Sequence, residues 1–382
     1  MSKILIINVP FHGHVNPTLA LTKELVNGGH VVTYLVTEEF RLKVEATGAR
    51  LESYEFDTTS YFTIENFRNI YNTAQRIAKD YDCILYGFMI IFGKELGYKL
   101  NKPTVCFYSS FAWNRDISKA VFSNCDFKIR ILGNRTFRKI AFSKALKNIS
   151  LYTNDIIDEI TDNPADLIIV TTTREFQIQN EKFDDARYKF VGPIIIDSND
   201  KSDIPFDRMK DRIIYISLGT IFNKSLEFYR QCMEGLKDLE ATVIMSIGKN
   251  TDIEALGTIP DNFYVRNFVP QLEVLKHASL FITHGGMNST NEAMYYGVPL
   301  IVVPQAADQP IVAKRVADLD LGIVLNKKDV SSEKISKNSL EILNNPKYKR
   351  NMEKMRDKMI EAGGEKVAAK EIENLIKRRS LK

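Results

Sequence analysis

A segment around His284 combines residue types that bind phosphate. It runs as a predicted strand at 280–282, a loop with two glycines and a helix that begins near Met287. Such a junction offers unpaired backbone N–H groups and the positive end of a helix dipole, both of which favour an anion. His284 adds a hydrogen-bond donor in the loop, and Ser289 adds a hydroxyl group in the first helical turn. The pattern predicts a phosphate site.

A carboxylate follows this site by one helical turn. Asn288 and Glu292 are four residues apart and therefore share one face of the helix. Glu292 is then well placed to accept hydrogen bonds from ribose hydroxyl groups. Taken singly, each feature has an ordinary structural explanation: a Gly-Gly turn, a serine helix cap, a solvated glutamate, a loop histidine. Their joint spacing favours a nucleotide site.

A second candidate for chemistry is His14. It follows a predicted strand and Gly13, and it precedes the pair Asn16-Pro17 at a predicted helix start. A neutral imidazole takes up a proton near pH 7, so His14 is a candidate general base. The alternative is a histidine that caps or packs the helix. A metal site shared with His12 is disfavoured because the sequence offers no third ligand at a suitable spacing.

The composition describes a chain large enough for two domains. It has 382 residues, 44% of them apolar, and roughly 150 residues per domain is typical. The 52 Lys and Arg residues against 48 Asp and Glu residues leave a net charge of +4, so no strong field of one sign points to nucleic acid. Four cysteines without paired metal spacing indicate buried thiols in a reducing compartment. With no signal peptide and no apolar run of about 18 residues, the sequence predicts a cytoplasmic protein without membrane insertion.

The elements that must position these histidines follow from the apolar pattern. Short β-branched runs alternate with longer amphipathic ones, which is typical of parallel sheets covered by helices. The predicted strands are 3–9, 31–36, 82–86, 104–108, 167–170, 213–217, 242–247, 263–266, 280–282, 300–303 and 322–324. The predicted helices are 17–27, 225–238, 288–296, 309–318, 332–343 and 346–362. Asn16 is expected to cap the first helix and Pro17 to occupy its first position.

The chain divides at a polar, aperiodic segment. Residues 197–203 are the best candidate linker. The predicted organisation is an N-terminal domain at 1–196, a linker at 197–211 and a C-terminal domain at 212–363. Ligands of open α/β sheets bind at the carboxyl ends of the strands. We therefore expect an α/β architecture of two Rossmann-like domains that face each other across a cleft.

The residues from Phe268 to Gln309 resemble the nucleotide-sugar signature of the UDP-glycosyltransferases that act on small lipophilic molecules, close to the bacterial macrolide-glycosyltransferase branch. The segments 10–17 and 28–34 are similar to the opening of the same family, so the resemblance covers nearly the whole chain. It implies the GT-B architecture, with the acceptor bound by the N-terminal domain and the donor by the C-terminal one. It also implies that the C-terminal helix, 364–380, packs back on the N-terminal domain.

The resemblance further implies roles for single residues. His14 would be the catalytic base, His284 the pyrophosphate ligand and Glu292 the ribose ligand. Phe268 would stack on uracil where plant members carry a tryptophan, and Asp308 with Gln309 would hold the sugar hydroxyl groups. The complete set of implied donor-binding residues is Thr220, Phe268, Val269, Gln271, His284, Asn288, Ser289, Glu292, Asp308 and Gln309.

One position departs from the family pattern. After the strand at 82–86 the family has an aspartate that orients the catalytic histidine, whereas this chain has Gly87. Loss of such a carboxylate costs on the order of 10⁴ in rate in related triads. Three explanations stay open: another acid such as Asp116 replaces it, the acceptor is acidic enough to need little help, or the protein binds donor without efficient transfer. Asp80 and Asp82 are weaker substitutes, since they should point away from the carboxyl end of the strand.

The sequence therefore predicts an inverting, metal-independent enzyme that transfers a hexose, with glucose favoured, from a UDP-sugar to a hydroxyl group of a small lipophilic acceptor. The UDP-sugar is a substrate, and no other cofactor is expected. Apolar and aromatic residues at 61–62, 88–92 and 108–113 offer acceptor surface, with core packing as the alternative. The oligomeric state is expected to be a monomer or a weak dimer.

The sequence leaves three rival functions to compare with this one. A nucleotide-sugar binding protein that has lost catalysis is the alternative that Gly87 suggests. A nucleotide-sugar epimerase or hydrolase on the same architecture is a second rival, of which the epimerase is disfavoured because acidic residues do not cluster. A nicotinamide-dependent dehydrogenase is disfavoured because residues 7–10 lack the required glycine-rich turn.

Overall fold

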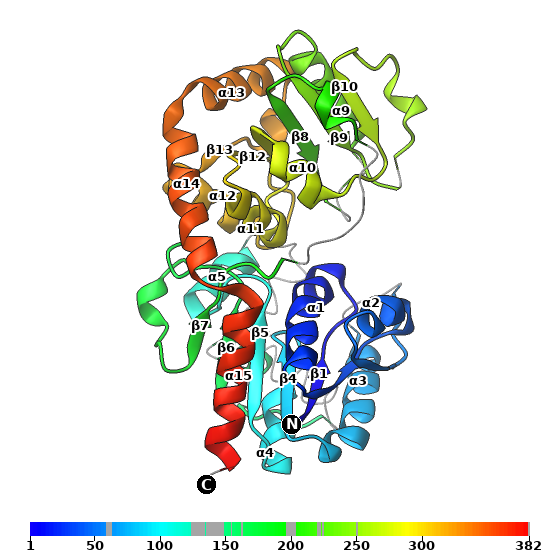
Figure 1. The fold of residues 1–382 in the computed structure, drawn as a ribbon, viewed down its shortest axis with the longest axis vertical. Coiled ribbons are helices and arrows are strands. Elements are labelled where there is room, and N and C mark those ends of the chain that lie inside the picture. Colours follow the sequence, from blue (N-terminus) through cyan, green and yellow to red (C-terminus); the bar gives the residue numbers. More distant parts are fainter. Residues whose placement is uncertain are drawn as a thin grey trace. The chain divides into compact units, whose positions relative to one another are not determined.

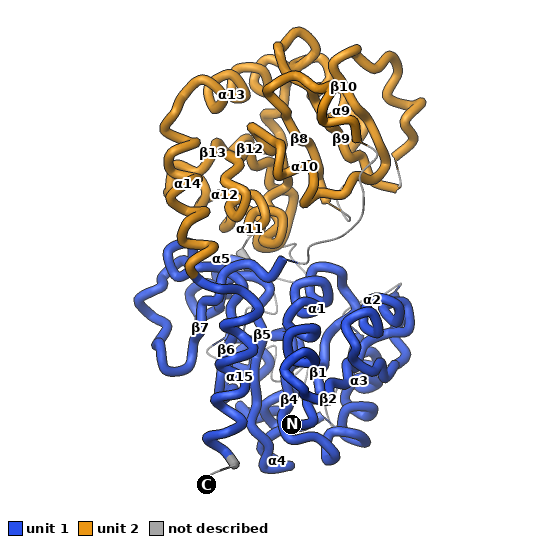
Figure 2. The backbone as a smooth tube through the Cα atoms, in the orientation of Figure 1, with its two compact units in different colours: residues 1–196, 362–382 blue, residues 197–361 orange. Residues whose placement is uncertain are grey.

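The chain forms two compact units (Figure 2). The first comprises residues 1–196 and 362–382, and the second comprises residues 197–361. The computed structural model describes residues 1–58, 63–123, 134, 149–153, 155–161, 163–195, 204–219, 223, 225–249 and 251–380. Residues 197–203 of the predicted linker lie outside the described residues.

Unit 1 is built on a parallel sheet of seven strands (Figure 1). The order across the sheet is β3-β2-β1-β4-β5-β6-β7. The strands are β1 (Lys3–Ile7), β2 (Val31–Leu35), β3 (Arg50–Glu52), β4 (Cys83–Gly87), β5 (Thr104–Tyr108), β6 (Leu167–Val170) and β7 (Tyr188–Phe190). Its described helices are α1 (His12–Asn27), α2 (Arg41–Glu45), α3 (Ile64–Ile77), α4 (Gly93–Leu100), α5 (Arg115–Ser123), α8 (Ile156–Ile160) and α15 (Gly364–Ser380). The central strands are buried along nearly their whole length, which explains their continuous apolar runs.

The last helix of the chain, α15, belongs to unit 1. It packs on α1, and Ala368, Ile372 and Ile376 join the same apolar cluster as Leu21 and Leu25 of that helix. The backbone N–H of the first residue of α15 donates to the carbonyl of residue 191 at 2.7 Å. An ion pair of 2.9 Å joins its last turn to the carboxylate of residue 166. Helix α15 is thus part of the core of unit 1.

Unit 2 repeats the same plan with six parallel strands in the order β10-β9-β8-β11-β12-β13. The strands are β8 (Ile213–Ser217), β9 (Thr242–Ser246), β10 (Phe263–Arg266), β11 (Leu280–Thr283), β12 (Leu300–Val302) and β13 (Gly322–Val324). The helices are α9 (Leu226–Leu236), α10 (Gln271–His277), α11 (Met287–Tyr296), α12 (Gln309–Asp318), α13 (Ser332–Asn344) and α14 (Pro346–Glu361). The two sheets confirm the predicted fold class of two Rossmann-like α/β units.

The predicted start of the first helix is wrong. Helix α1 begins at His12, with Phe11 as its N-cap, and the N–H groups of residues 14 and 15 both donate to the Phe11 carbonyl at 2.8 and 2.9 Å. Asn16 is therefore not the cap, and Pro17 lies inside the helix, where it has no N–H to donate to the carbonyl of Gly13. The correction matters because it moves His14 from a loop into the first helical turn.

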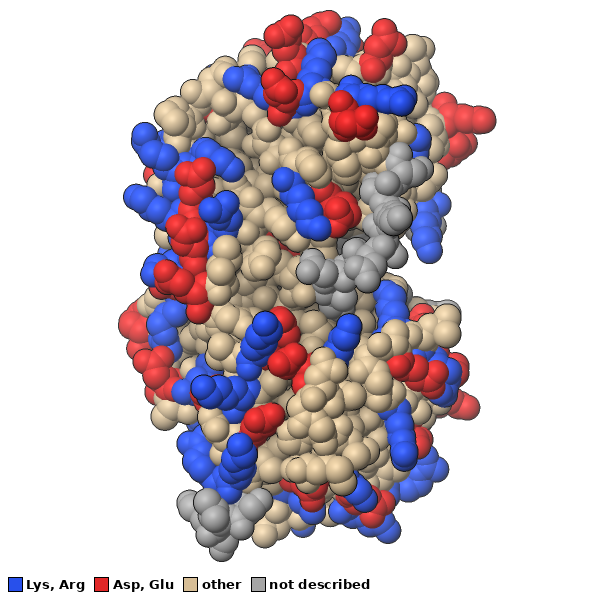
Figure 3. All heavy atoms as spheres, in the orientation of Figure 1, with Lys and Arg blue, Asp and Glu red and all other residues tan. Residues whose placement is uncertain are grey.

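The described surface carries both signs of charge. On the face drawn in Figure 3, Lys and Arg side chains alternate with Asp and Glu side chains over both units. This mixture agrees with the net charge of +4. Over the described ranges, no helix combines the length and apolarity needed to cross a membrane.

Candidate active site

Both candidate histidines lie at the same topological position, one in each unit. In unit 1 the strand order reverses between β1 and β4, and in unit 2 it reverses between β8 and β11. The carboxyl ends of strands at such a switch point are where open α/β sheets bind ligands. His14 follows β1, and His284 follows β11 directly. Each unit therefore presents one imidazole at its own switch point.

The imidazole of His284 lies between two glycines. A Cβ atom on Gly219 would stand 2.7 Å from its Cε1 atom, and a Cβ atom on Gly286 would stand 2.5 Å from its Nε2 atom. Gly219, in the loop after β8, also has a φ of +74°, which favours glycine. The hydroxyl oxygen of Thr283 lies 3.4 Å from Nδ1. We call Gly219, His284 and Gly286 the glycine cradle.

Burial in this cradle lowers the pKa of His284 to about 4. A hydrogen bond with the backbone of Ser217 opposes this fall in pKa. The ring is therefore neutral at pH 7 and has one N–H group. Helix α11 starts at Met287, directly after the cradle, with Gly286 as its N-cap. A ring donor and a helix N-terminus thus adjoin at one point, which is the arrangement that the sequence predicts for a phosphate site.

Three predicted donor residues form one hydrogen-bonded cluster, Gln271–Ser289–Glu292. The side-chain amide of Gln271, at the start of α10, donates to Glu292 Oε2 at 2.5 Å and to Ser289 Oγ at 3.2 Å. The hydroxyl group of Tyr215, from β8, donates to Gln271 Oε1 at 3.3 Å. Burial raises the pKa of Glu292 to about 7, and the hydrogen bond from Gln271 opposes that rise. The carboxylate is thus close to its titration point at neutral pH.

The remaining predicted donor residues differ in exposure. Phe268 is 72% exposed, so its ring offers a surface on which a base could stack, whereas Val269 beside it is buried. Asp308 is the N-cap residue of α12. Gln309 is buried, and its side-chain oxygen accepts hydrogen bonds from the N–H groups of residues 305 and 306 at 2.8 and 3.1 Å. Asn288 is half-buried in the first turn of α11, and Thr220 lies outside the described residues.

The loop that carries Asp308 and Gln309 holds a strained residue that the sequence did not indicate. Ala307 has a φ of +57°, a value rare for a residue with a side chain. The two hydrogen bonds from the loop to Gln309 Oε1 hold this turn in place. Such strain tends to occur at functional sites.

His14 is surrounded by aromatic rings. Its imidazole stacks on Phe88, with centroids 5.3 Å apart and planes at 26°, and meets the edge of Phe11 at 5.8 Å. Phe88 continues the stack to Tyr108 at 5.0 Å. Burial among these rings lowers the pKa of His14 to about 4. The ring is neutral at pH 7, as a base must be, and no described carboxylate contributes to its pKa.

Two of the acids considered as partners for His14, Asp116 and Asp82, are engaged elsewhere. The carboxylate of Asp116, in the first turn of α5, pairs with Lys182 at 2.9 Å and with Lys119 at 3.7 Å. Asp82 accepts a hydrogen bond from the N–H of Lys3 at 2.8 Å, which is the amino end of β1. Gly87 lies at the opposite end of its strand. Asp82 therefore points away from the switch point, as the sequence predicts.

Some residues of the predicted acceptor surface are buried in the core, and others are half-buried near His14. Phe111 is buried and stacks on Phe176 at 5.5 Å, so it belongs to the core. Trp113 is half-buried and tilts against Phe88 at 5.8 Å. Phe11 and Phe56 are also half-buried and meet edge to face at 6.2 Å. Residues 61 and 62 lie outside the described residues. Of these rings, Phe11 contacts His14 directly, and Trp113 contacts Phe88, which stacks on His14.

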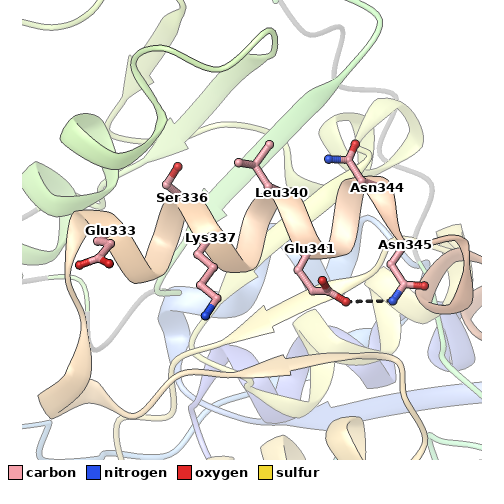
Figure 4. A pocket seen from close by; sticks show the side chains of 7 residues that line it. All are labelled: Glu333, Ser336, Lys337, Leu340, Glu341, Asn344 and Asn345. Atoms are coloured by element: carbon pink, nitrogen blue, oxygen red, sulfur yellow. Dashed lines mark hydrogen bonds between the residues drawn. The ribbon is translucent and has the colours of Figure 1, made fainter.

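A hollow in unit 2 lies apart from these residues. It runs along α13 and is lined by Glu333, Lys337 and Leu340, among others (Figure 4). The side chain of Asn345 donates to Glu341 Oε1 there at 2.9 Å. None of the predicted site residues lines it. We assign it no role in the chemistry.

Sequence reasoning missed one residue of the His14 site, Asn8. Its side chain is buried and donates to the His14 carbonyl at 2.9 Å. A single asparagine after an apolar strand is a weak signal, because the same residue type caps many turns. Only the folded chain reveals its partner.

The chain is similar to known proteins over nearly its whole length. The family model described as "Erythromycin biosynthesis protein CIII-like, C-terminal domain" matches residues 230–375. NDP-glycosyltransferase YjiC of Bacillus subtilis is 37% identical to this chain, over 99% of the chain and 98% of its own length. The uncharacterized UDP-glucosyltransferase YojK of the same organism is 32% identical, over 100% of the chain and 99% of its own length.

A solved structure resembles the whole chain. CalG4, the calicheamicin glycosyltransferase, superposes with a TM-score of 0.84 over 99% of both chains, at 27% sequence identity. The likeness confirms the predicted GT-B architecture. The chain is a glycosyltransferase that belongs to the UDP-glycosyltransferase family, in the branch of the bacterial macrolide glycosyltransferases.

Proposed function

We propose that this enzyme transfers a hexose, with glucose as the preferred sugar, from a UDP-sugar to a hydroxyl group of a small lipophilic acceptor. The proposal includes inversion at the anomeric carbon and no requirement for a metal ion. The observation that carries it is the pair of neutral imidazoles at the two switch points, since each unit supplies one group that the reaction needs.

In this proposal the donor is held by unit 2. His284 and the start of α11 would stabilise the charge that develops on the departing diphosphate, which replaces the electrostatic work of a metal ion. Glu292 and Gln271 would hold the ribose, and Phe268 would stack on the uracil. Supporting observations are the glycine cradle, the Gln271–Ser289–Glu292 cluster and the 72% exposure of Phe268.

In the same proposal the acceptor is activated by unit 1. His14 would take the proton of the acceptor hydroxyl group as its oxygen attacks the anomeric carbon from the side opposite the leaving diphosphate. The bond to the diphosphate oxygen breaks as the new C–O bond forms, and inversion follows from that direction of attack. The half-buried rings of Phe11, Phe56 and Trp113 support an apolar acceptor.

The relatives bear on substrate class. Two are named as an NDP-glycosyltransferase and a UDP-glucosyltransferase, which supports a UDP-linked glucose. Erythromycin and calicheamicin, in the names of the family model and the solved structure, are natural products and support a natural-product acceptor. A binding protein without transfer is not favoured, because these relatives are named as transferases. Three buried free thiols, Cys83, Cys106 and Cys232, support a cytoplasmic location.

The test is transfer from UDP-glucose to a panel of phenols and macrolides, followed by mass spectrometry. We expect a product heavier by one hexose, with the β linkage that inversion of the α-linked donor produces. His14→Ala should abolish turnover and leave the dissociation constant of UDP unchanged, while the control His277→Ala should keep both. Near-full turnover of His14→Ala would refute the base assignment. An α-linked product would refute inversion, and loss of activity in EDTA restored by Mg²⁺ would refute metal independence.

A further inference from the structure

The side chain of Asn8 holds the backbone that carries His14. Asn8 follows β1 and is 1% exposed. Its Nδ2 atom donates to the His14 carbonyl at 2.9 Å and to the hydroxyl oxygen of Tyr34 at 3.2 Å, and its Oδ1 atom accepts from the N–H of Val9 at 3.0 Å. Both amide hydrogens are thus used. A flipped amide would place an oxygen against the His14 carbonyl, so these partners set its orientation.

The partners of Asn8 are themselves anchored. The Tyr34 hydroxyl group lies 2.5 Å from the hydroxyl group of Thr18, which in turn donates to the Val15 carbonyl at 2.7 Å. The Tyr54 hydroxyl group donates to the backbone carbonyl of Asn8 at 2.5 Å. All these side chains are buried. The network therefore joins the end of β1 to β2 and to the first turns of α1, which is the turn that presents His14.

Gly87 leaves the space that the Asn8 amide occupies. In the parallel register Ile7 faces Tyr86, so Asn8 and Gly87 come next on neighbouring strands. A Cβ atom on Gly87 would stand 2.3 Å from Asn8 Oδ1 and 3.1 Å from its Cγ. The φ of Gly87 is not among the positive values of this chain. Glycine is thus required here by space and not by backbone conformation.

His14 has few other restraints on its position. Neither ring nitrogen has a hydrogen-bond partner among the described residues. The ring is held by its stack on Phe88 and by the edge of Phe11, and its backbone is held by Asn8. Phe88 follows Gly87 directly. The segment 87–88 therefore contacts both the Asn8 amide and the His14 ring.

We propose that Asn8 is the positioning residue for the catalytic His14, and that residue 87 is glycine in this chain because it must leave room for the Asn8 amide. The inference rests on the role of His14 in the proposed function. In this proposal a neutral, buried hydrogen-bond network orients His14. A side chain at residue 87 would lower activity because it would displace the Asn8 amide.

A double-mutant cycle on Asn8 and Gly87 tests this coupling. Asn8→Ala and Gly87→Ala should each lower kcat between about tenfold and about 100-fold, because a small displacement of a catalytic group has that cost. The KM for UDP-glucose should stay unchanged. In the double variant the loss should equal that of Asn8→Ala alone, since no amide remains to be displaced. Losses that multiply, or near-native kcat in Asn8→Ala, would overturn the proposal.

Asn163→Ala is the matched control for loss of a buried asparagine. Asn163 is also 1% exposed and also bonds to a tyrosine hydroxyl group, that of Tyr86. If its melting temperature falls as far as that of Asn8→Ala while its kcat stays near native, the effect of Asn8 is on position and not on stability alone. Equal loss of kcat in both variants would overturn the proposal.

A readout without turnover separates this inference from the proposed function. The chain has five histidines, so selective ¹³Cε1 labelling yields few resonances, and His14→Ala assigns the relevant one. Asn8→Ala and Gly87→Ala should shift and broaden the His14 signal and leave that of His284 in place. An unmoved His14 signal would overturn the role of Asn8. Absence of transfer by the wild-type enzyme would count against the proposed function only.

Discussion

At the scale of the residue, burial sets the protonation states of the two sites. His14 and His284 both have a pKa of about 4, because each ring has lost solvent to its neighbours. Glu292 moves the other way, to about 7, because burial disfavours its charged form. At neutral pH both imidazoles are therefore uncharged and Glu292 is close to half ionised. The proposed base, His14, must be neutral to accept a proton, and the neutral ring of His284 still has one N–H group.

The pKa of Glu292 predicts that donor affinity depends on pH. Ribose hydroxyl groups donate hydrogen bonds to a carboxylate, so UDP-glucose should bind the ionised form better. Affinity should therefore rise between pH 6 and pH 8, by up to about tenfold per pH unit on the acid side of the transition. Titration calorimetry at several pH values measures it. Glu292→Gln should bind more weakly and without this pH dependence, and a wild-type affinity that is constant with pH would contradict the ribose role.

At the scale of the element, each site is made where the end of a strand meets the start of a helix. The loop after β8 supplies Gly219, and the junction of β11 with α11 supplies His284 and Gly286. Two glycines let two backbones approach one imidazole, which no pair of residues with side chains would allow. In unit 1 the end of β1 and the end of β4 meet in the same way through Asn8 and Gly87.

The glycine cradle predicts the effect of Gly219→Ala. The new methyl group would lie 2.7 Å from the His284 ring and force it out of place. The dissociation constant of UDP-glucose should rise by about tenfold or more, the effect of losing a hydrogen bond to a charged group. Gly257→Ala is the matched control, because Gly257 has a φ of +86° but no atom within 4 Å of its would-be Cβ. Equal weakening in both variants would attribute the effect to backbone strain.

Substitutions in helix α15 should change the stability of unit 1, although this helix lies at the other end of the sequence from most of that unit. Ile372 is fully buried in the unit 1 cluster, so Ile372→Ala should lower the free energy of unfolding by about 2–5 kcal/mol. Val367 lies on the same helix and is 38% exposed, so Val367→Ala should cost under about 0.5 kcal/mol. Urea unfolding of both variants measures the difference. Similar midpoints would contradict the packing of α15 on the first core.

At the scale of the whole molecule, the buried groups of the two sites change stability with pH in opposite senses. In unit 1 the pKa of His14 lies below its ordinary value of 6.5. As the pH falls, His14 is protonated in the unfolded chain before it is protonated in the folded one. The free energy of unfolding therefore decreases as the pH falls from 6.5 to 4. In unit 2 His284 acts in the same sense, but Glu292 acts in the opposite one. Its raised pKa makes stability increase as the pH falls from about 7 to 4.5.

Acid sensitivity should therefore respond in opposite directions to two substitutions. His14→Phe removes an acid-sensitive group, so the loss of stability between pH 6.5 and 4 should become shallower, by up to about 1.4 kcal/mol per pH unit. Glu292→Gln removes the compensating group and should make the same loss steeper. Melting temperatures followed from pH 7 to pH 4 test both. Parallel pH profiles of the two variants and the wild type would show that burial does not perturb these groups.

The sequence alone determined the alternation of strands and helices, because buried parallel strands must be apolar along their whole length. Every predicted strand is present in the structure. The strands β3 and β7 were missed because each has three residues at the edge of its sheet, too few for a period. Helix α1 was misplaced because proline at a first helical position is the commoner case, whereas here the turn after β1 starts the helix five residues earlier.

The sequence also determined which residue types could bind a nucleotide-sugar, because the His284 segment carries them within one short strand-loop-helix unit. Only the tertiary structure decided how distant segments complete that site. Gln271 reaches Glu292 from another helix, and Gly219 closes on His284 from another strand. The tertiary structure also changed the interpretation of Gly87. In the sequence this position is only the absence of the family's aspartate. In the folded sheet the same position is the space filled by the amide of Asn8, a relation between neighbouring strands that no local pattern encodes.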